Sequence, residues 1–287
     1  MANMRAIRTR IKSVKNTQQI TKAMKMVAVS KLRKTQAGMT AMRPFAEKSR
    51  ELLDTLLSGD SSLPNRFITP HKTNEKVVYV LFVGNRGLCG VYNNAVLRFA
   101  QELVKNDSRD CELLVCGRWG KDIIAKTGIR VKASFPDISD TPDAEQAIQL
   151  ADHLKNLYLS GEADEIHLVY QNYVSALRQD PTDEIFLPAR PTNGGNAINR
   201  EFIFAPDKKE LLESVMQLYL NNRVYAVMLT ARCGEHSSRM TAMTAATDST
   251  KELIGELGLS LNRARQAAIT TEISEIVGGA EALKSSH

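Results

Sequence analysis

Aromatic residues are missing from both ends of the chain. Every Phe, Tyr and Trp of the 287 residues lies between Phe45 and Tyr225. Large aromatic side chains build globular cores, so we expect no such core from either end. The C-terminal end holds small residues instead, among them Ala245, Ala246 and Ala267, whose size lets two helices approach closely. The composition divides the chain into two slender ends and a middle of about 150 residues, a normal size for one domain.

Proline is also missing after Pro206. Residues 207–285 are predicted to form one helix that starts with Asp207 as its N-cap. At 1.5 Å per residue this helix would be roughly 110 Å long, and it needs a partner along most of its length to bury its apolar stripe. That stripe has helical spacing and consists of Leu211, Val215, Leu218, Leu253, Leu257, Leu261, Ile269, Ile273, Ile276, Ala280 and Leu283.

The predicted partner is a helix formed by residues 1–57. Pro44 predicts a kink or a restart within it. The two helices would pair as an antiparallel coiled coil; if the first ends opposite residue 209, it begins opposite a position near 265. The last ~20 residues then project as a single helix roughly 30 Å long, which another protein should receive. The seam of the first helix follows steps of mostly four and three: Ile7, Ile11, Val14, Gln18, Thr21, Lys25, Ala28, Leu32, Thr35, Met39, Met42, Ala46, Leu53 and Leu56.

Acidic residues are nearly absent from the first 50 positions. This stretch has 13 Lys and Arg but only one acid, Glu47, which gives a net charge of +12; the rest of the chain is −6. Such a basic helix favours an anionic partner, which can be nucleic acid, an anionic membrane or acidic protein loops. A simply solvated face is the alternative, but solvated helices usually mix both signs to gain pairs four residues apart.

Long hydrophobic runs and cysteine motifs are lacking as well. The longest apolar run, residues 77–83, is far too short to cross a bilayer. The basic N-terminus superficially resembles a transit peptide, but its pattern continues for 50 residues in heptad register. The cysteines have no CxxC and no metal-ligand spacing, so we interpret them as reduced thiols of an intracellular protein: Cys89, Cys111, Cys116 and Cys233.

The middle of the chain, residues 75–205, predicts a Rossmann-like α/β domain. Strands alternate with helices there, which indicates a largely parallel sheet with helices on its faces. Pro188, Pro191 and Gly194 mark a long loop. The expected strands are 77–83, 111–116, 130–135, 165–170, 183–187 and 201–204, and the expected helices are 91–105, about 121–126 and 143–159.

Motifs of catalysis are not found. The turn from Gly84 to Gly90 has the spacing G-x-x-G-x-x-G, which fits neither dinucleotide-binding nor P-loop patterns. We favour a tight turn in which the glycines let strand and helix pack closely, while a phosphate cradle stays the alternative. His167 alternates within a strand and is interpreted as a hydrogen-bonded sheet residue rather than a ligand. We expect no metal site and no active site on this chain.

Residues at both ends carry a resemblance to a known family. The N-terminal match covers Ile7, Arg8, Ile11 and residues 16–28 and 30–34, and the middle adds residues 86–90. The C-terminal match covers residues 239–240, 242–243, 245–248 and 262–267, followed by Ile269, Thr270, Thr271, Glu272, Glu275, Gly279 and Ala280. In order and spacing these resemble the gamma subunit of F-type ATP synthases. One departure is Val91, where such subunits often have a second glycine.

The resemblance implies a rotor without an active site of its own. Its coiled coil would turn inside a hexamer of alpha and beta subunits, and its middle domain would stand on a ring of c subunits and bind an epsilon subunit. It would couple proton flow to ATP synthesis or hydrolysis on the beta subunits, which would hold the Mg-ATP or Mg-ADP. No cofactor is expected on this chain, and the expected place is the cytoplasmic face of a bacterial membrane, attached through the c ring.

The same resemblance implies three groups of contact residues. Contacts that transmit torque to the beta subunits are expected from Lys22, Met24, Lys25, Lys31, Arg33, Lys34, Arg239, Arg265, Gln266, Thr270 and Glu272. An apical bearing is expected from Ile269, Ile273, Ile276, Ala280 and Leu283, and a foot on the c ring and epsilon from Ile203, Phe204 and Asp207. The lysines can instead serve solubility, and Met24 can be a seam residue.

Two other functional classes stay open from the residues alone. A nucleic-acid-binding arm would show steep salt dependence, but it would not need a partner helix along its whole length. A nucleotide enzyme with its site in the Gly84–Gly90 turn would bind nucleotide stoichiometrically as an isolated chain.

Overall fold

The computed structural model describes residues 2–58, 65–120, 128–190 and 208–284. Their contacts gather into two units. One unit holds residues 1–27 and 242–287, and the other holds residues 28–241. The predicted strand 201–204 and the predicted helix at 121–126 lie outside the described residues, as does most of the predicted loop after Pro188.

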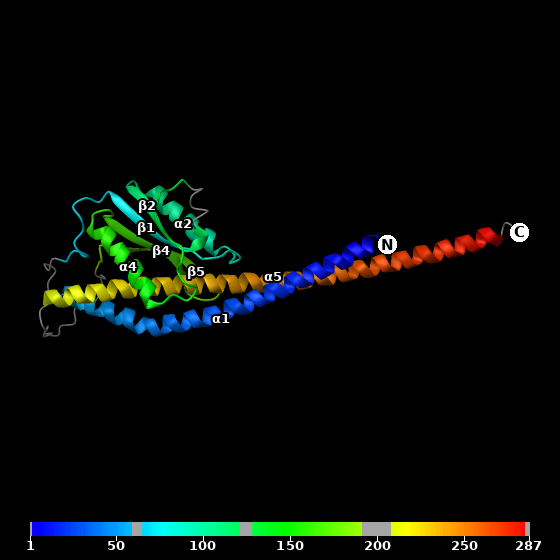
Figure 1. Cartoon of the computed structure of the whole chain (residues 1–287), viewed down its shortest axis with the longest axis horizontal. Coiled ribbons are helices and arrows are strands. Elements are labelled where there is room, and N and C mark those ends of the chain that lie inside the picture. The colour runs from blue at the N-terminus through cyan, green and yellow to red at the C-terminus, as the bar shows by residue number, and fades with distance from the viewer. Residues whose placement is uncertain (1, 59–64, 121–127, 191–207, 285–287) are drawn as a thin grey trace. The chain divides into compact units, whose positions relative to one another are not determined.

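A five-stranded sheet forms the centre of the larger unit (Figure 1). Its strands are β1 (Lys76–Phe82), β2 (Asp110–Cys116), β3 (Val131–Phe135), β4 (Glu165–Tyr173) and β5 (Gln179–Leu187). They lie in the order β3-β2-β1-β4-β5, and all neighbours are parallel except β4 and β5. The strand order therefore reverses between β1 and β4, the position where such sheets open a crevice at the carboxyl ends of their strands.

Both faces of the sheet are covered by helices, which explains why β1 is a continuous apolar run. On one face Val77, Tyr79 and Leu81 pack against α2 (Tyr92–Asn106). On the other face Val78, Val80 and Phe82 join a core that includes α4 (Ala144–Leu159) and the first turns of α5 (Lys208–Lys284). The predicted α/β class and largely parallel sheet are thus confirmed.

The last strand differs from the expectation in where it starts. β5 begins at Gln179 rather than at residue 183, and it includes Pro181. A proline cannot donate a hydrogen bond to the ladder, but β5 is at the edge of the sheet and has a partner on one side only. The sequence pattern after Tyr173 hid this extension because Gln179, Asp180 and Thr182 are polar and half-buried, and Pro181 is exposed.

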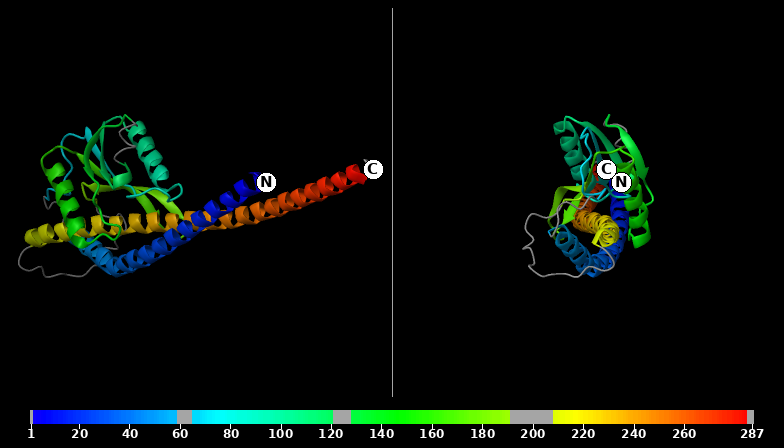
Figure 2. Two further views of the ribbon diagram at one scale, coloured as in Figure 1. Left: turned by 45° about the vertical axis from the view of Figure 1, so that its right-hand side comes forward. Right: turned by 90° about the vertical axis from the view of Figure 1, so that its left-hand side faces the viewer.

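The N-terminal helix α1 (Ala2–Ser58) runs without interruption through Pro44. The predicted restart was therefore wrong, although Figure 2 shows the helix changing direction in its light-blue stretch. Pro44 removes only one backbone donor, and its ring is on the exposed side of the helix. The helix can therefore continue through the proline.

In the larger unit, α1 packs against α5 along the predicted seam. Ala28, Leu32 and Thr35 are buried, and so is Ser49, which fills the one seam position that the sequence pattern skipped. The hydroxyl of Thr230 lies 3.9 Å from the sulfur of Met39. A Cβ on Gly38 would be in van der Waals contact with Leu229, which shows how closely the two helices approach.

In the smaller unit, the two helices meet through a polar pair. Thr247 Oγ1 donates to Thr21 Oγ1 over 2.9 Å, and Thr21 and Met243 are buried. Equal steps along both helices from this pair place the N-terminus opposite a position about 20 residues after Thr247, close to the expected 265. Polar pairs of this kind fix the register of a coiled coil.

Beyond this pairing, the end of α5 is exposed. Among the described side chains Ala268 is the last half-buried one, and every one from Ile269 to Gly278 is exposed, as is Ala280. The predicted projecting helix is thus present in the smaller unit. Within the described residues, no helix is both long and apolar enough to span a membrane.

Candidate functional site

The crevice at the carboxyl ends of β1 and β4 is where a sheet of this topology usually binds a ligand. Here α5 fills it with its own side chains. Arg232 is 4% exposed and its guanidinium donates to the carbonyl oxygens of Val83 (3.3 Å), Ile138 (3.1 Å) and Ser139 (3.1 Å). The same guanidinium donates to Asn85 Oδ1 at 3.1 Å and to Glu235 at 2.5 Å.

Glu235 is the anionic centre of this crevice. Its side chain is 1% exposed and lies between Arg232 and Arg239, at 2.5 and 2.7 Å. Burial alone would raise the pKa of Glu235, but the two guanidinium groups outweigh it, so the pKa is lowered and the carboxylate stays ionised. A Cβ on Gly84 would be 2.8 Å from Glu235 Cδ, so only glycine lets the helix come this near.

The glycine-rich turn presents the wrong groups for a phosphate. Arg239 Nη2 donates to the carbonyl oxygens of Arg86 (3.0 Å) and Gly87 (3.3 Å). A phosphate cradle needs backbone N–H groups that point inward, whereas these carbonyls bind a cation. Gly90 has φ +59°, which suits glycine in a tight turn. The geometry supports the close-packing interpretation of this turn over the phosphate cradle.

Lys31, expected at a beta-subunit contact, forms an ion pair with Asp140. Asn85 Nδ2 also donates to Asp140 at 3.0 Å. Burial would raise the pKa of Asp140, but the bonds from Lys31 and Asn85 lower it to about 2. His236 Nε2 donates to the backbone oxygen of Asp140 at 2.8 Å, and burial lowers the pKa of His236, which keeps it neutral.

The other expected torque contacts on α1 are divided by exposure. Lys22, Arg33 and Lys34 are exposed, whereas Met24 and Lys25 are half-buried on the seam side. The structure therefore places three of the expected cations on the outside of α1 and one, Lys31, in an internal pair. Arg239 on α5 is likewise engaged inside the chain, with 11% of its side chain exposed.

The projecting end of α5 carries the remaining expected contacts. Its polar members are exposed: Arg265, Gln266, Thr270 and Glu272. Its apolar members are exposed as well: Ile269 (47%), Ile273 (56%), Ile276 (72%) and the smaller Ala280. The side chain of Leu283 lies outside the described residues, as do Ile203, Phe204 and Asp207, so the expected foot has no structural description.

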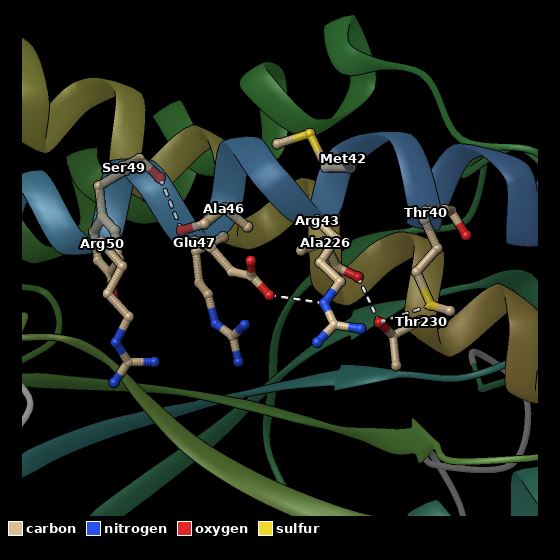
Figure 3. Close-up of a pocket in the computed structure, with 12 residues that line it drawn as sticks. Thr40, Met42, Arg43, Ala46, Glu47, Ser49, Arg50, Ala226 and Thr230 are labelled. Atoms are coloured by element: carbon tan, nitrogen blue, oxygen red, sulfur yellow. Dashed lines mark hydrogen bonds and ion pairs between the residues drawn. The ribbon is translucent and has the colours of Figure 1, made fainter.

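A groove between α1 and α5 was not expected from the sequence (Figure 3). It has a volume of about 370 Å³, an apolar wall that includes Met42, Ala46 and Ala226, and arginines at its rim. Arg43 pairs with Glu47 at 2.7 Å across one turn of α1. Because seam positions 42 and 46 are small or flexible, the helices leave this space between them.

Sequence reasoning also missed Arg232, Glu235 and Asp140. A signal was available on α5, where charges recur at i, i+3 and i+7 within a stretch of small residues. What it lacked was the partner, since Asp140 and Ile138 are almost a hundred residues away in the chain. Among the described residues, no group of three metal-ligating side chains is close enough to hold an ion.

Fold and site together define an α/β domain whose ligand crevice is occupied by its own C-terminal helix, and whose two terminal helices are paired. That is the architecture of a stalk protein. A family model described as "ATP synthase" matches residues 3–283. The chain belongs to this family, and specifically to its gamma chains.

Membership among the gamma chains is shown by relatives that align with this chain over their full lengths. The ATP synthase gamma chain of Desulfitobacterium hafniense is 42% identical over 284 residues, which cover 99% of this chain and 100% of the relative. That of Chloroherpeton thalassium is 39% identical over 303 residues and covers 100% of both chains. That of Moorella thermoacetica is 41% identical, covering 99% and 100%. Gamma chains are the rotor subunits of the central stalk, and this chain has that place in the ATP synthase complex.

Solved structures show the same fold at lower identity. A chain of the Euglena gracilis mitochondrial ATP synthase, from the OSCP/F1/c-ring part in rotational state 3, has a TM-score of 0.71 and 20% identity. It covers 98% of this chain and 95% of that one. A chain from the central stalk and c ring of the Tetrahymena thermophila enzyme has a TM-score of 0.62 and 24% identity, covering 79% and 99%.

Proposed function

We propose that this rotor subunit turns inside a hexamer of alternating alpha and beta subunits and couples proton flow through a c-subunit ring to ATP synthesis or hydrolysis. The observation that carries the proposal is the end of α5, where every described residue from Ile269 to Gly278 is exposed. Isoleucines exposed on a lone helix cost free energy unless another protein covers them. An apical bearing formed by the hexamer would cover Ile269, Ile273, Ile276, Ala280 and Leu283.

Coupling of rotation to ATP synthesis or hydrolysis would follow from the asymmetry of the paired helices α1 and α5. Each beta subunit has open and closed states that differ in nucleotide affinity, and a rotor contact that favours one state shifts its population. Because the two helices present different side chains on each side, three beta subunits around them receive different contacts at any one angle. Rotation then drives each beta subunit through its states in turn.

The proposed contacts to the hexamer form two groups, one near the end of α5 and one along α1. Near the bearing, Arg265, Gln266, Thr270 and Glu272 would bind polar groups of the hexamer. Lower down, acidic loops of the beta subunits would meet the basic helix, whose candidate contacts are Lys22, Met24, Lys25, Lys31, Arg33 and Lys34, with Arg239 on α5. Lys31 and Arg239 also hold partners within the chain, so their contact to a beta subunit would compete with Asp140 and Glu235.

The chain has no active site of its own in this proposal. The beta subunits hold Mg-ATP or Mg-ADP and carry out the chemistry. Occupation of the usual ligand crevice by Arg232, Glu235 and Arg239 supports this assignment. The α/β domain, with Ile203, Phe204 and Asp207 at its foot, would bind the c ring and the epsilon subunit.

The proposed location is the cytoplasmic face of a bacterial cell membrane, reached only through the c ring. It is supported by the relatives, which are bacterial gamma chains.

Native purification tests the assembly. The tagged chain is released from membranes with low-salt EDTA buffer, and the partners are sized and assayed for ATPase. We expect two larger subunits in threefold excess together with ATPase activity. Recovery of nuclease-sensitive material without ATPase would instead support the nucleic-acid arm.

A second measurement separates the rotor from a nucleotide enzyme. The isolated chain is titrated with Mg-ATP by calorimetry, and no stoichiometric binding is expected. Binding of one ATP per chain at micromolar affinity would contradict this expectation and would support a nucleotide site in the Gly84–Gly90 turn.

A further inference from the structure

We propose that Arg232 is the joint through which torque passes between the α/β domain and α5, an inference that rests on the rotor function proposed above. A joint that transmits torque must resist rotation of the helix about its own axis and sliding along it. The residue that does so must make directional bonds to several parts of the domain at once.

Apolar packing alone does not give this resistance. On the core side of the sheet, α5 buries Val224, Val227 and Met228 among apolar side chains. Such contacts are favourable but non-directional, so they resist a small roll of the helix only weakly. Hydrogen bonds weaken steeply when they bend. Hydrogen bonds between the helix and the domain therefore resist a tangential force on the helix.

Arg232 makes more of these bonds to the domain than any other described residue of α5. Its planar fork reaches the end of β1 through the carbonyl of Val83 and the segment after β3 through those of Ile138 and Ser139. Nη2, which donates to the carbonyl of Ile138, also donates to Asn85 Oδ1 at 3.1 Å, while Nε and Nη1 donate to Ser139 and Val83. The guanidinium is thus fixed from three directions, and its rigid geometry lets no single bond adjust independently.

The same segment of the domain also holds α1. Asp140, one residue after Ser139, pairs with Lys31 of α1 and accepts from Asn85. His236, one turn after Arg232 on α5, donates to the backbone of Asp140. Residues 138–140 therefore contact both helices, and a displacement of this segment pulls on both together.

Other polar ties between α5 and the domain are simpler. Arg223 pairs with Glu184 of β5 and has 26% of its side chain exposed. Lys155 of α4 reaches Gln217 and Asn221 with a flexible ammonium group. Arg223 also donates to the hydroxyl of Tyr170 in β4 at 3.3 Å, so it holds α5 to side chains of two adjacent strands, and Lys155 holds it to α4. Neither bonds to the backbone of the domain, as Arg232 does.

The test uses the complete ATP synthase in proteoliposomes and the variant Arg232→Lys, which keeps the charge but loses the fork. Ions pumped per ATP hydrolysed are measured without a gradient and then at a gradient that halves the wild-type pumping rate. We expect the ratio to be within about twofold of wild type without the gradient and to fall at least about threefold under load. ATPase of the detached alpha–beta–gamma sector should change less than twofold, because the unloaded sector does not pass torque through the α/β domain.

The matched control is Arg223→Lys, the same exchange on the same helix, which should keep wild-type pumping per ATP under load. A ratio for Arg232→Lys equal to wild type at every load would overturn the proposal. A lowered melting temperature with an unchanged ratio would do the same, because it would reduce Arg232 to a structural role.

A milder variant covers the case in which Arg232→Lys does not assemble. Asn85→Ala removes one acceptor of the fork and should reduce pumping per ATP under load by a smaller factor. If Arg232→Lys fails to assemble and Asn85→Ala pumps as many ions per ATP under load as wild type, the proposal that Arg232 transmits torque would also be overturned. If the wild-type complex contained the chain but did not pump at all, the rotor function itself would fail, which is a different result.

Discussion

At the scale of single residues, two glycines of one turn differ in how closely other atoms pack around them. Gly84 faces Glu235 and Asn93, and an added Cβ would be 2.8 and 3.0 Å from their atoms. Gly87 has nothing within 4 Å of the same position and no positive φ. The spacing of the glycines in the sequence gives no sign of this difference, since it depends on a helix that follows 150 residues later.

Replacement of these glycines by alanine tests the difference. Gly84→Ala should destabilise the purified chain by about 1–3 kcal/mol, because the crowded site must shift backbone or the buried carboxylate. Gly87→Ala should be neutral or stabilising by up to about 1 kcal/mol, because the unfolded chain loses freedom. Urea unfolding followed by circular dichroism measures both. Equal effects of the two exchanges would contradict the close packing at Gly84.

A second residue-scale feature is the charge of His167. Its Nδ1 lies 2.8 Å from Asp183 and its Nε2 lies 2.9 Å from Glu165, so only the doubly protonated ring donates to both carboxylates. Burial would lower its pKa, but the hydrogen bonds and charges of Asp183 and Glu165 outweigh burial and raise the pKa of His167.

This raised pKa predicts a pH dependence of stability. The contribution of His167 is fully present below the ordinary pKa of about 6.5 and is lost as the pH rises through its higher folded value. The free energy of unfolding of the wild type minus that of His167→Asn should therefore shrink between pH 6 and pH 9. A difference that stays constant or grows over this range would show that the ring is neutral when folded.

His236 supplies a control of opposite sign. Burial lowers its pKa, so its neutral form is the stable one, and its contribution is lost as the pH falls through the ordinary value of about 6.5. The stability of His236→Gln relative to wild type should then improve on acidification from pH 7 to pH 5, again measured by urea unfolding.

At the scale of elements, the long helices followed from sequence pattern. The seam of α1 repeats by fours and threes, and the residues at those positions are the less exposed ones, from Ile7 through Leu56. Of the kink or restart expected at Pro44, only the restart was wrong, because a lone proline on the exposed side bends a helix that packing holds on its other side. Strand β5 was placed too late because an edge strand does not need an apolar pattern over its whole length.

A proline in the middle of α5 tests the helix as one mechanical element. Ala245→Pro removes a backbone bond and clashes with the preceding turn, which costs about 3 kcal/mol or more. We expect ATP hydrolysis without ion pumping, or loss of assembly. Ala245→Ser is the control, with pumping per ATP like wild type, since residue 245 is exposed. Normal pumping by Ala245→Pro would contradict the role of α5 as a continuous shaft.

At the scale of the whole molecule, the basic N-terminal stretch remains the most distinctive charge pattern. Of its 13 cations, those at Arg33 and Lys34 are exposed, while Lys31 pairs with Asp140. If acidic loops of the beta subunits follow this surface, the exposed pair contributes to torque through attraction that salt screens. Lys31 would instead act on the contact between α1 and the α/β domain.

Charge reversal separates these roles in single-molecule rotation. Arg33→Glu combined with Lys34→Glu should lower the stall torque of the alpha–beta–gamma sector by roughly a third or more at low salt, less at high salt. The control, Lys72→Glu with Lys105→Glu, makes the same change in net charge on exposed residues of the α/β domain and should leave torque unchanged. Unchanged torque in the first variant would reduce these cations to solubilising charge.

The sequence by itself determined what depends on local pattern. Periodicity of three and four specifies helices, apolar runs specify buried strands, and the lack of aromatics and acids specifies slender basic ends. Family membership followed from short matches in order and spacing at both ends. These features need no knowledge of which distant residues meet.

Only the tertiary structure decided which charges work together. Arg232, Glu235 and Arg239 are near one another on a helix. Their partners at residues 83–87 and 138–139 become neighbours only when the sheet has formed and α5 packs against it. The structure likewise moved Lys31 from the surface into a pair with Asp140. A side chain's charge is fixed by its type, whereas its burial and its partners depend on contacts between segments about a hundred residues apart, and no local pattern encodes those.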